Sequence, residues 1–296
     1  MRTGFNIVAI IYTFNPDIKL FSKVLKSSSM QVDHVVVVDN HSKNFSKISQ
    51  LCGSSDNCHF IRLKYNSGVQ ALNVAIDYAI NILNANWILI LDQDAILKPN
   101  AIEIAFTRLY EIRRDLKIGI LHLGGMNVKQ KTASGLLVVE KLPTFSGCII
   151  SAKVLRDEGI SIRSDFFLDQ ADFDLFENIK RSGYRLIMTK EKLIDNQVGV
   201  QHPWLKKLRS KPIISLLIAS SYEPLWRYYY IVRNSTTLLL EGKLPLSFYI
   251  RQLISWGFSS ALVEGVKKTI KTLMIGLAHG IFKRLGYLDP KFLNVD

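Results

Sequence analysis

The chain has 296 residues, of which 48% are hydrophobic and 21% charged, a balance that is typical of a globular protein with a large core. Its formal net charge is +13, and the residues from 201 onward carry 14 Lys and Arg against 5 Asp and Glu. This basic surplus predicts an anionic partner, and a nucleic acid, a lipid surface and a phosphorylated substrate all fit.

The cysteines and the hydropathy pattern exclude several protein classes. The three cysteines, Cys52, Cys58 and Cys148, form neither a disulfide framework nor a zinc pattern, which indicates a reducing compartment. No run of about 18 apolar residues appears, so no membrane-spanning helix is predicted. The amino terminus enters a strand-like segment at once, without a signal peptide. We therefore expect a protein of the cytoplasm.

Strand-like and helical patterns alternate along roughly the first 115 residues. In chain order they predict a strand at 5–12, a helix at 18–26, strands at 35–38 and 60–63, a helix at 69–83, a strand at 87–91 and a helix that opens at Pro99. The alternation predicts an α/β fold in which a doubly wound parallel sheet carries helices on both faces.

The strand at 87–91 is an unbroken apolar run that stops at Asp92-Gln93-Asp94. Positions two apart on a strand point to the same side, so Asp92 and Asp94 are expected to face the same way and to repel each other. A hard cation such as Mg²⁺ or Mn²⁺ would relieve that repulsion and hold a diphosphate. The alternative is a solvated strand end, with the carboxylates in a turn that Pro99 closes.

Two other strands also end in polar residues. The first strand leads to Thr13 and Asn15, and the second leads to Asp39. Ligands of parallel sheets bind beyond the carboxyl ends of the strands, so these side chains are expected at one edge together with Asp92. Neither Gly-x-Gly-x-x-Gly nor a P-loop motif follows the first strand, which disfavours dinucleotide-binding and P-loop proteins.

A second group of carboxylates precedes a predicted helix in the middle of the chain. Strands are predicted at 118–123, 136–139 and 148–150, and a helix runs from Asp169 to Ser182, with Gly183 after its end. Asp169 as the N-cap and Asp172 three residues later resemble a capping box. These carboxylates either complement the start of the helix or act in catalysis, and both interpretations stay open.

The last third of the chain is basic and amphipathic. Arg and Tyr interleave over residues 227–234, a pattern that suits base stacking, diphosphate binding or helix packing. From Leu262, apolar residues recur at helical spacing, while Lys267, Lys268 and Lys271 lie off that stripe. Such a helix either lies in a membrane interface or docks on the catalytic domain or on a second subunit.

Several short motifs follow one another along the chain. They are Thr13-Phe14-Asn15-Pro16, four valines before Asp39-Asn40, Asn66-x-Gly68-x-x-Ala71-x-Asn73, Asp92-Gln93-Asp94, Ser146-Gly147, Phe166-Phe167-x-Asp169-x-x-Asp172 and Gly183-Tyr184. In this order they resemble the inverting nucleotide-sugar glycosyltransferases of family 2, which have the GT-A fold. A further motif, Arg227-x-Tyr229-Tyr230-x-x-Arg233-Asn234, is similar to the bacterial rhamnosyltransferase branch. The resemblance covers roughly residues 5–240, and the ordered set is more specific than any single motif.

The resemblance implies an α/β, GT-A fold with a mostly parallel central sheet, flanked by helices, and a helical, basic C-terminal extension. Residues 1–240 would form the glycosyltransferase domain, with nucleotide binding in about 1–115 and acceptor binding in about 116–240. Residues 241–296 would contact a membrane surface or a second copy of the chain. The implied place is the cytoplasmic side of the plasma membrane.

The resemblance also implies the partners of the reaction. The donor would be a nucleoside-diphosphate sugar, dTDP-linked in the first instance and UDP-linked in the second, and the acceptor a saccharide or lipid-linked hydroxyl in surface polysaccharide synthesis. No nucleic acid is implied as a partner. The implied donor-binding residues are Thr13, Asn15, Asp39, Asn66, Gly68, Asn73 and Asp92.

The family assigns roles to the carboxylates as well. Mg²⁺ or Mn²⁺ would be held by Asp94, by Asp92 and by His202, and would neutralise the departing diphosphate. Asp172 matches the catalytic base that deprotonates the acceptor hydroxyl. The implied phosphate or acceptor contacts are Asp169, Arg227 and Arg233.

Two features weigh against a simple match, and two rival functions remain. Many relatives carry an arginine six residues after the base, where this chain has Asn178, and Asp169 varies among relatives. A phosphatase that uses Asp-x-Asp as its nucleophile would want Thr or Val where Ile96 stands. A nucleic-acid-binding protein would explain the charge of +13 but not the carboxylates at the strand ends.

Overall fold

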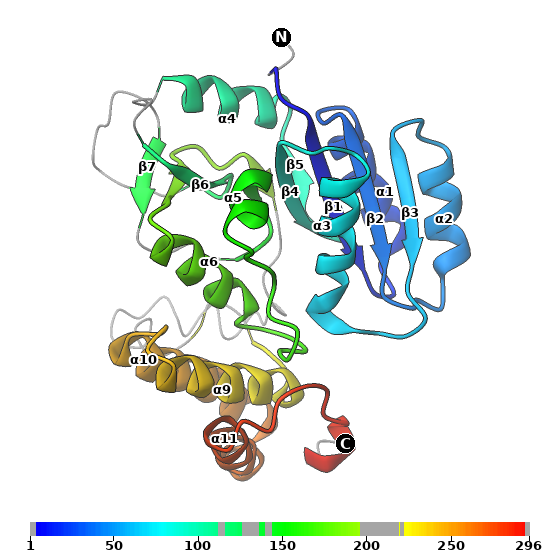
Figure 1. Cartoon of the computed structure of the whole chain (residues 1–296). Coiled ribbons are helices and arrows are strands. Elements are labelled where there is room, and N and C mark those ends of the chain that lie inside the picture. The colour runs from blue at the N-terminus through cyan, green and yellow to red at the C-terminus, as the bar shows by residue number, and fades with distance from the viewer. Residues whose placement is uncertain are drawn as a thin grey trace. The chain divides into compact units, whose positions relative to one another are not determined.

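The computed structural model describes residues 4–111, 116–125, 136–139, 144–195, 219 and 222–293 (Figure 1). The chain forms two compact units, and each is described by itself below. The first comprises Met1–Ile162 and Leu175–Gln197, and the second comprises Arg163–Asp174 and Val198–Asp296. The functional boundary predicted near residue 240 stays a prediction.

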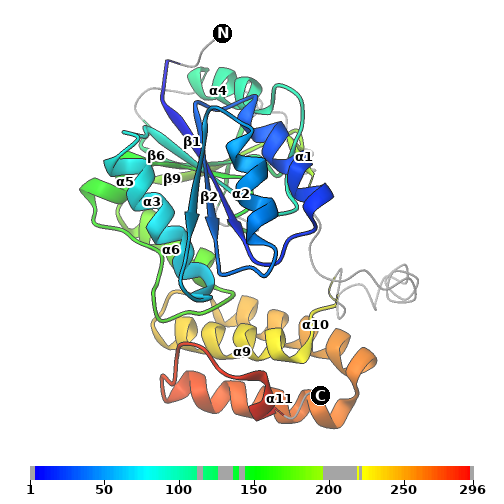
Figure 2. The same cartoon turned by 90° about the vertical axis from the view of Figure 1, so that its right-hand side faces the viewer.

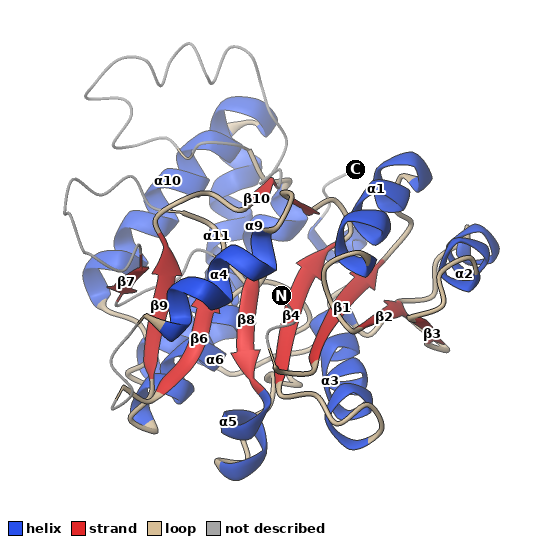
Figure 3. Cartoon of the chain, turned by 90° about the horizontal axis from the view of Figure 1, so that it is seen from above, coloured by secondary structure: helices blue, strands red, loops and turns tan. Residues whose placement is uncertain are grey.

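An eight-stranded sheet forms the centre of the first unit (Figure 3). Its order is β3 (Cys58–Arg62), β2 (His34–Asp39), β1 (Ile7–Thr13), β4 (Trp87–Asp92), β8 (Cys148–Ser151), β6 (Ile118–His122), β9 (Arg185–Thr189) and β7 (Leu136–Val139). The first four strands run parallel, while β8 and β7 run antiparallel to their neighbours. The predicted α/β fold with a mostly parallel sheet is therefore confirmed.

Helices cover both faces of the sheet, which explains why its central strands are apolar without alternation. On one face lie α1 (Ile18–Ser29), α2 (Phe45–Gly53) and α4 (Ala101–Tyr110), which share a core with β1, β2 and β4. On the other face lies α3 (Ala71–Asn81), and Figure 3 shows α1 and α3 on opposite sides of these strands. Val35–Val38 are accordingly fully buried.

Short elements complete the described part of this unit. They are the 3₁₀ turn η1 (Gly68–Gln70), the antiparallel pair β5 (Ile96–Leu97) and β10 (Ile194–Asp195), and α5 (Ala152–Asp157). Helix α6 (Ala171–Arg181) begins in the second unit and ends in the first.

The second unit contains α9 (Leu225–Leu240), α10 (Leu246–Glu264), α11 (Val266–Ile281) and the 3₁₀ turn η2 (Pro290–Leu293). Figure 2 shows α9, α10 and α11 lying against one another. The predicted basic amphipathic helix does not run on from Leu262, because Gly265 has a φ of 99° and ends α10. None of the described helices has the length and apolarity needed to span a membrane.

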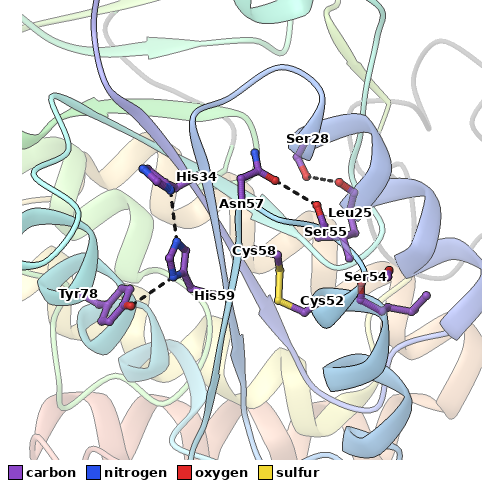
Figure 4. The surroundings of a disulfide bond; sticks show 11 residues. Leu25, Ser28, His34, Cys52, Ser54, Ser55, Asn57, Cys58, His59 and Tyr78 are labelled. Atoms are coloured by element: carbon purple, nitrogen blue, oxygen red, sulfur yellow. Dashed lines mark hydrogen bonds between the residues drawn. A yellow bond between two sulfur atoms is a disulfide. The ribbon is translucent and has the colours of Figure 1, made fainter.

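One prediction about the cysteines was wrong. Cys52, in the last turn of α2, and Cys58, the first residue of β3, form a disulfide, with their Cα atoms 5.3 Å apart (Figure 4). Their separation of six residues hid the pairing, since the turn between α2 and β3 folds the chain back on itself. Cys148 is a buried free thiol. The cysteines thus give no argument for a reducing compartment.

Candidate active site

The parallel register of β1, β2 and β4 brings the predicted polar residues to one edge of the sheet. Thr13 pairs with Asp39 across β1 and β2, and Tyr12 pairs with Asp92 across β1 and β4. Their side chains also interact. The Thr13 hydroxyl donates to Asp39 Oδ1 at 3.1 Å, and the Tyr12 hydroxyl donates to Asp92 Oδ1 at 2.5 Å. Tyr12 was not among the residues predicted from sequence, although it directly precedes Thr13.

The loops after β1 and β2 are tied together around Asp39, which is fully buried. The Ser42 amide donates to Asp39 Oδ2 at 3.0 Å, and the Ser42 hydroxyl accepts from the Asn15 amide at 2.8 Å. Asn15 Oδ1 in turn accepts from the Lys43 amide, and its backbone adopts a left-handed φ of 48°. The loops therefore hold Asp39 and Asn15 in fixed positions, as a binding edge requires.

A third loop joins the same edge through Asn40, which also escaped prediction. Its side-chain amide donates to the Gly68 carbonyl at 2.8 Å and accepts from the Ser67 amide at 3.0 Å. Asn66 Oδ1 accepts from the Gly68 amide, which closes a turn in which Gly68 has a φ of 61°. Asn40 directly follows a buried strand and Asp39, and this position in the sequence could have identified it as a residue of the edge.

Asn73 has a different environment from the other predicted nucleoside contacts. Its Nδ2 donates to the Ile162 carbonyl at 2.8 Å, and its Oδ1 accepts from the Ile162 amide at 3.0 Å. Both ends of the amide therefore bind backbone 89 residues away in sequence. Its role in donor binding stays a prediction.

The Asp-x-Asp segment differs from the geometry predicted for it. Strand β4 ends at Asp92, and the Ala95 amide donates to the Asp92 carbonyl at 3.1 Å, so Asp94 lies in a turn. The argument that two positions on one strand face the same side was therefore wrong here. Both carboxylates are half-buried, and the Asp92 amide is held by the Ser146 hydroxyl at 3.1 Å.

These two carboxylates suit a hard divalent cation. Among the described residues, no group of three or more His, Cys, Asp and Glu side chains is placed to hold a metal ion. Mg²⁺ commonly takes one or two carboxylates and completes its shell with water and substrate phosphates, which Asp92 and Asp94 permit. The third predicted ligand, His202, lies outside the described residues.

In the second unit, the predicted base Asp172 follows a tight backbone turn. Asp169 and Gln170 have left-handed φ values of 57° and 66°, and α6 begins only at Ala171. Asp169 is therefore not the N-cap, and Asp172 is the second helical residue rather than the third, which corrects the predicted capping box. Asp172 is half-buried in the first turn, where the helix dipole favours a negative charge.

Helix α9 holds this left-handed turn from two positions, which we call the α9 clamp (Arg227 and Asn234). Asn234 is fully buried, and its Nδ2 donates to the Leu168 carbonyl at 2.6 Å and to the Asp169 carbonyl at 3.0 Å. The Arg227 guanidinium donates to the Asp169 carboxylate through Nε and Nη2. Two consecutive left-handed residues other than glycine cost free energy, which the clamp offsets.

Arg227 also donates through Nη1 to Glu223, at 3.1 Å. Glu223 is buried, and this burial raises its pKa to about 7, with Arg227 opposing the shift and Asp169 adding to it. Both terminal groups of Arg227 therefore bind carboxylates of its own unit. The predicted contact of Arg227 with phosphate or acceptor stays a prediction, as does that of Asp169.

Arg233, the residue before Asn234 in the same helix, is also buried. Its Nε donates to Asn234 Oδ1 at 2.8 Å and its Nη1 to the Gly286 carbonyl at 2.7 Å, while the guanidinium lies over the rings of Tyr229 and Tyr230. Arg233 thus orients the Asn234 amide of the clamp. Its Nη2 is buried without a hydrogen-bond partner in the described structure, and its predicted phosphate contact stays a prediction.

Comparisons with known proteins show which proteins this chain is similar to. Residues 8–153 match the family model described as Glycosyl transferase family 2. The dTDP-rhamnosyl transferase RfbF of Shigella flexneri is 25% identical over 279 residues, which cover 89% of this chain and 90% of that protein. The crystal structure of S. aureus TarS 1-349 aligns with a TM-score of 0.49 and 17% identity, over 94% of this chain and 87% of that one.

Proposed function

Residues 8–153 belong to glycosyl transferase family 2, so the chain is a glycosyltransferase of the GT-A fold, and we propose that it transfers L-rhamnose from a dTDP-sugar. The observation that carries the proposal is the edge where the parallel register pairs Thr13 with Asp39 and Tyr12 with Asp92. The similarity to a protein named as a dTDP-rhamnosyl transferase supports the choice of sugar and nucleotide over a UDP-sugar.

The proposed donor site uses the residues of this edge. Asp39 accepts a hydrogen bond from the ring N–H of a pyrimidine base, while Thr13 and Asn15 line the nucleoside together with Asn66, Gly68, Asn73 and Asp92. A base that lacks the matching N–H forgoes this hydrogen bond, so the site should discriminate between nucleotides. The fixed positions of Asp39 and Asn15 support this role.

Asp94 and Asp92 are the residues that would hold Mg²⁺ or Mn²⁺. The ion, when bound, supplies Lewis-acid stabilisation of the diphosphate leaving group. The oxygen-only donor pair supports this assignment, since hard cations prefer carboxylate oxygens.

Asp172 is proposed as the base of an inverting displacement. Its carboxylate takes the proton from an acceptor hydroxyl while that oxygen forms a bond to C1 of the sugar, and the bond from C1 to the diphosphate oxygen breaks on the opposite face. The base must be ionised to do this, and the first turn of α6 favours a negative charge.

The acceptor is proposed to be a saccharide or lipid-linked hydroxyl in the synthesis of a surface polysaccharide such as O-antigen or capsule. The reaction would then take place in the cytoplasm, at the inner face of the plasma membrane. The basic surplus of the C-terminal third, with 14 Lys and Arg against 5 Asp and Glu from residue 201 onward, supports a negatively charged surface nearby.

Thermal unfolding with nucleoside diphosphates tests the donor and the metal together. We expect dTDP with Mn²⁺ or Mg²⁺ to raise the melting temperature more than UDP or GDP, since a ligand that binds the folded state stabilises it. Asp94→Ala should abolish the metal-dependent part of the shift, whereas Asp77→Ala, which removes an exposed carboxylate of α3, should retain it. A full metal-dependent shift in Asp94→Ala would remove the metal assignment.

Single-turnover transfer tests the base separately. Asp172→Asn keeps the size of the side chain but removes the proton acceptor, so we expect donor binding to persist while turnover falls by about 10²-fold to 10⁴-fold. The same thermal assay with dTDP measures donor binding. Near-normal turnover in this variant would rule out Asp172 as the base.

A further inference from the structure

Helices α10 and α11 of the second unit carry large apolar side chains on their outer faces. On α10 they are Leu246, Ile250, Ile254, Phe258 and Leu262, and on α11 they are Val266, Ile270, Met274 and Ile281. Each is between 41% and 61% exposed. We call these nine side chains the apolar strip. Soluble proteins rarely expose so many large apolar residues in successive helices without a partner.

The inner faces of the same helices are lined by small residues. The buried residues of α11 are Thr269, Thr272, Gly276 and Gly280, and those of α10 are Ser259, Ser260 and the larger Tyr249. A Cβ on Gly280 would lie 2.6 Å from the Arg233 carbonyl of α9, and one on Gly276 would lie 2.8 Å from Val232. Glycine therefore permits close contact between α11 and α9.

On α11 this distribution is the reverse of an ordinary amphipathic helix, which buries its large apolar residues and exposes small and polar ones. Helix α10 differs, because Leu253 and Trp256 also pack against the α9 core. The large apolar side chains of α11 that pack against the α9 core, Leu273 and Leu277, are themselves partly exposed. Close packing through small residues is the arrangement that helices use where the surrounding medium is itself apolar. The outer faces therefore suit an apolar medium better than water.

Two lysines of α11 lie next to its exposed apolar residues, which is the arrangement found in helices that bind an anionic membrane surface. With about 100° per residue, Val266, Ile270 and Met274 fall within an arc of about 80°, and Lys267 and Lys271 lie directly beside that arc. The buried residues fall at about 240° to 320° from Val266, so they flank the arc on the side away from these two lysines. Lysine stems beside an apolar face let the ammonium groups reach phosphate while the apolar side chains enter the acyl region.

The acidic residue of these two helices is engaged within the second unit. Between residues 246 and 281 the chain contains Arg251 and three lysines but one acid, Glu264. Glu264 is bound by the Tyr222 hydroxyl and by the Leu225 amide, at 3.1 Å in the second case. A second copy docked through the same strip would thus bring lysines together without a complementary carboxylate, whereas an anionic bilayer supplies the opposite charge.

From these observations we infer that α10 and α11 form a monotopic membrane anchor, whose apolar strip enters one leaflet of an anionic bilayer. The inference extends the proposed function by naming the surface through which the enzyme would meet a lipid-linked acceptor. It does not depend on the sugar or on the metal, since binding to lipid needs no donor.

Flotation of the full-length protein with vesicles tests the inference. We expect binding to phosphatidylcholine vesicles that contain about 30% phosphatidylglycerol, which gives them a negative surface potential, and far weaker binding to phosphatidylcholine alone. Ile250→Ser, Ile254→Ser and Ile270→Ser together should weaken binding by at least about tenfold, because three apolar side chains leave the acyl boundary. The matched control, Ile82→Ser with Met30→Ser, removes two exposed apolar residues of the first unit and should bind normally.

The charge contribution is measured with Lys267→Gln and Lys271→Gln together. Each lysine near an anionic surface contributes about fivefold, so the double variant should lose on the order of 25-fold in affinity at low salt. Circular dichroism and the dTDP-dependent thermal shift check that every variant is folded. Because the thermal shift needs no vesicles, failure of the anchor and failure of the donor assignment are distinguishable.

Other outcomes would overturn the inference. Wild-type protein that fails to float with anionic vesicles, or that floats equally well after the isoleucine substitutions, has no such anchor. A protein that does not bind vesicles and is a dimer by light scattering, which the isoleucine substitutions convert to a monomer, uses the apolar strip for a second copy instead.

Discussion

The α9 clamp gives a quantitative prediction for Asn234→Ala. The substitution removes the hydrogen-bond partner of the part-buried Leu168 and Asp169 carbonyls and of the buried Arg233 Nε–H. Each such loss costs about 1 kcal/mol or more, so we expect a total near 3 kcal/mol. With about 2.1 cal/mol/K of unfolding entropy per residue, this lowers the melting temperature by about 5 °C if the chain unfolds cooperatively.

The same substitution should impair catalysis in a way that stability alone does not explain. Release of the left-handed turn at Asp169 and Gln170 allows the start of α6 to relax, which displaces Asp172. A misplacement of about 1 Å costs on the order of 10²-fold in rate, so kcat should fall by about that factor. The KM for the donor should change little, because the proposed donor residues belong to the first unit.

A matched control on the same helix separates positioning from stability. Thr237 is fully buried, and its hydroxyl donates to the carbonyls of Arg233 and Gly280. Thr237→Val removes these bonds without touching the turn, so it should cost about 1–2 kcal/mol and leave kcat unchanged at a temperature where both variants are folded. If Asn234→Ala destabilised the protein but kept wild-type kcat, the positioning role of the clamp would be refuted.

Two further predictions concern Glu223 and the disulfide. Burial holds the pKa of Glu223 at about 7, above its ordinary value of 4.5, so the folded state binds the proton more tightly than the unfolded state does. The protonated Glu223 side chain therefore contributes to the unfolding free energy below pH 4.5, and up to about 3 kcal/mol of this contribution should be lost as the pH rises through about 7. Urea unfolding should show that the unfolding free energy of Glu223→Gln depends less on pH than that of the wild type. The Cys52–Cys58 bond closes a short loop, so Cys52→Ser with Cys58→Ser should lower the unfolding free energy by about 2 kcal/mol. Reductant should then destabilise the wild type alone, and an equal effect on both proteins would contradict the contribution of the bond.

The strands and their polar ends were predictable because they depend on local pattern. Four valines before Asp39 and five apolar residues before Asp92 require burial on both faces, and parallel strands align their carboxyl ends without further information. The register that pairs Thr13 with Asp39 follows from the same alignment. This is why the edge could be expected from sequence.

Other features could not be predicted from the sequence, because contacts between residues far apart in the chain determine them. Asp169 adopts a left-handed conformation, rather than capping the helix, because Arg227 and Asn234 hold it from 58 and 65 residues away. The strand-based argument for Asp94 failed because β4 ends at Asp92 and the chain turns toward Ala95. The hydrophobic periodicity of a short segment indicates which of its residues are buried. It does not indicate contacts with residues far away in the sequence.

The hydrogen bonds of the Asn73 side chain fix the position at which the backbone leaves the first unit. Ile162, whose amide and carbonyl it binds, is the last residue of the first unit before the chain passes into the second at Arg163. The departure point of the backbone is thereby fastened to α3, directly after the 66–70 segment that is proposed to meet the nucleoside. The two hydrogen bonds of the Asn73 side chain therefore fix where the chain leaves the first unit relative to α3.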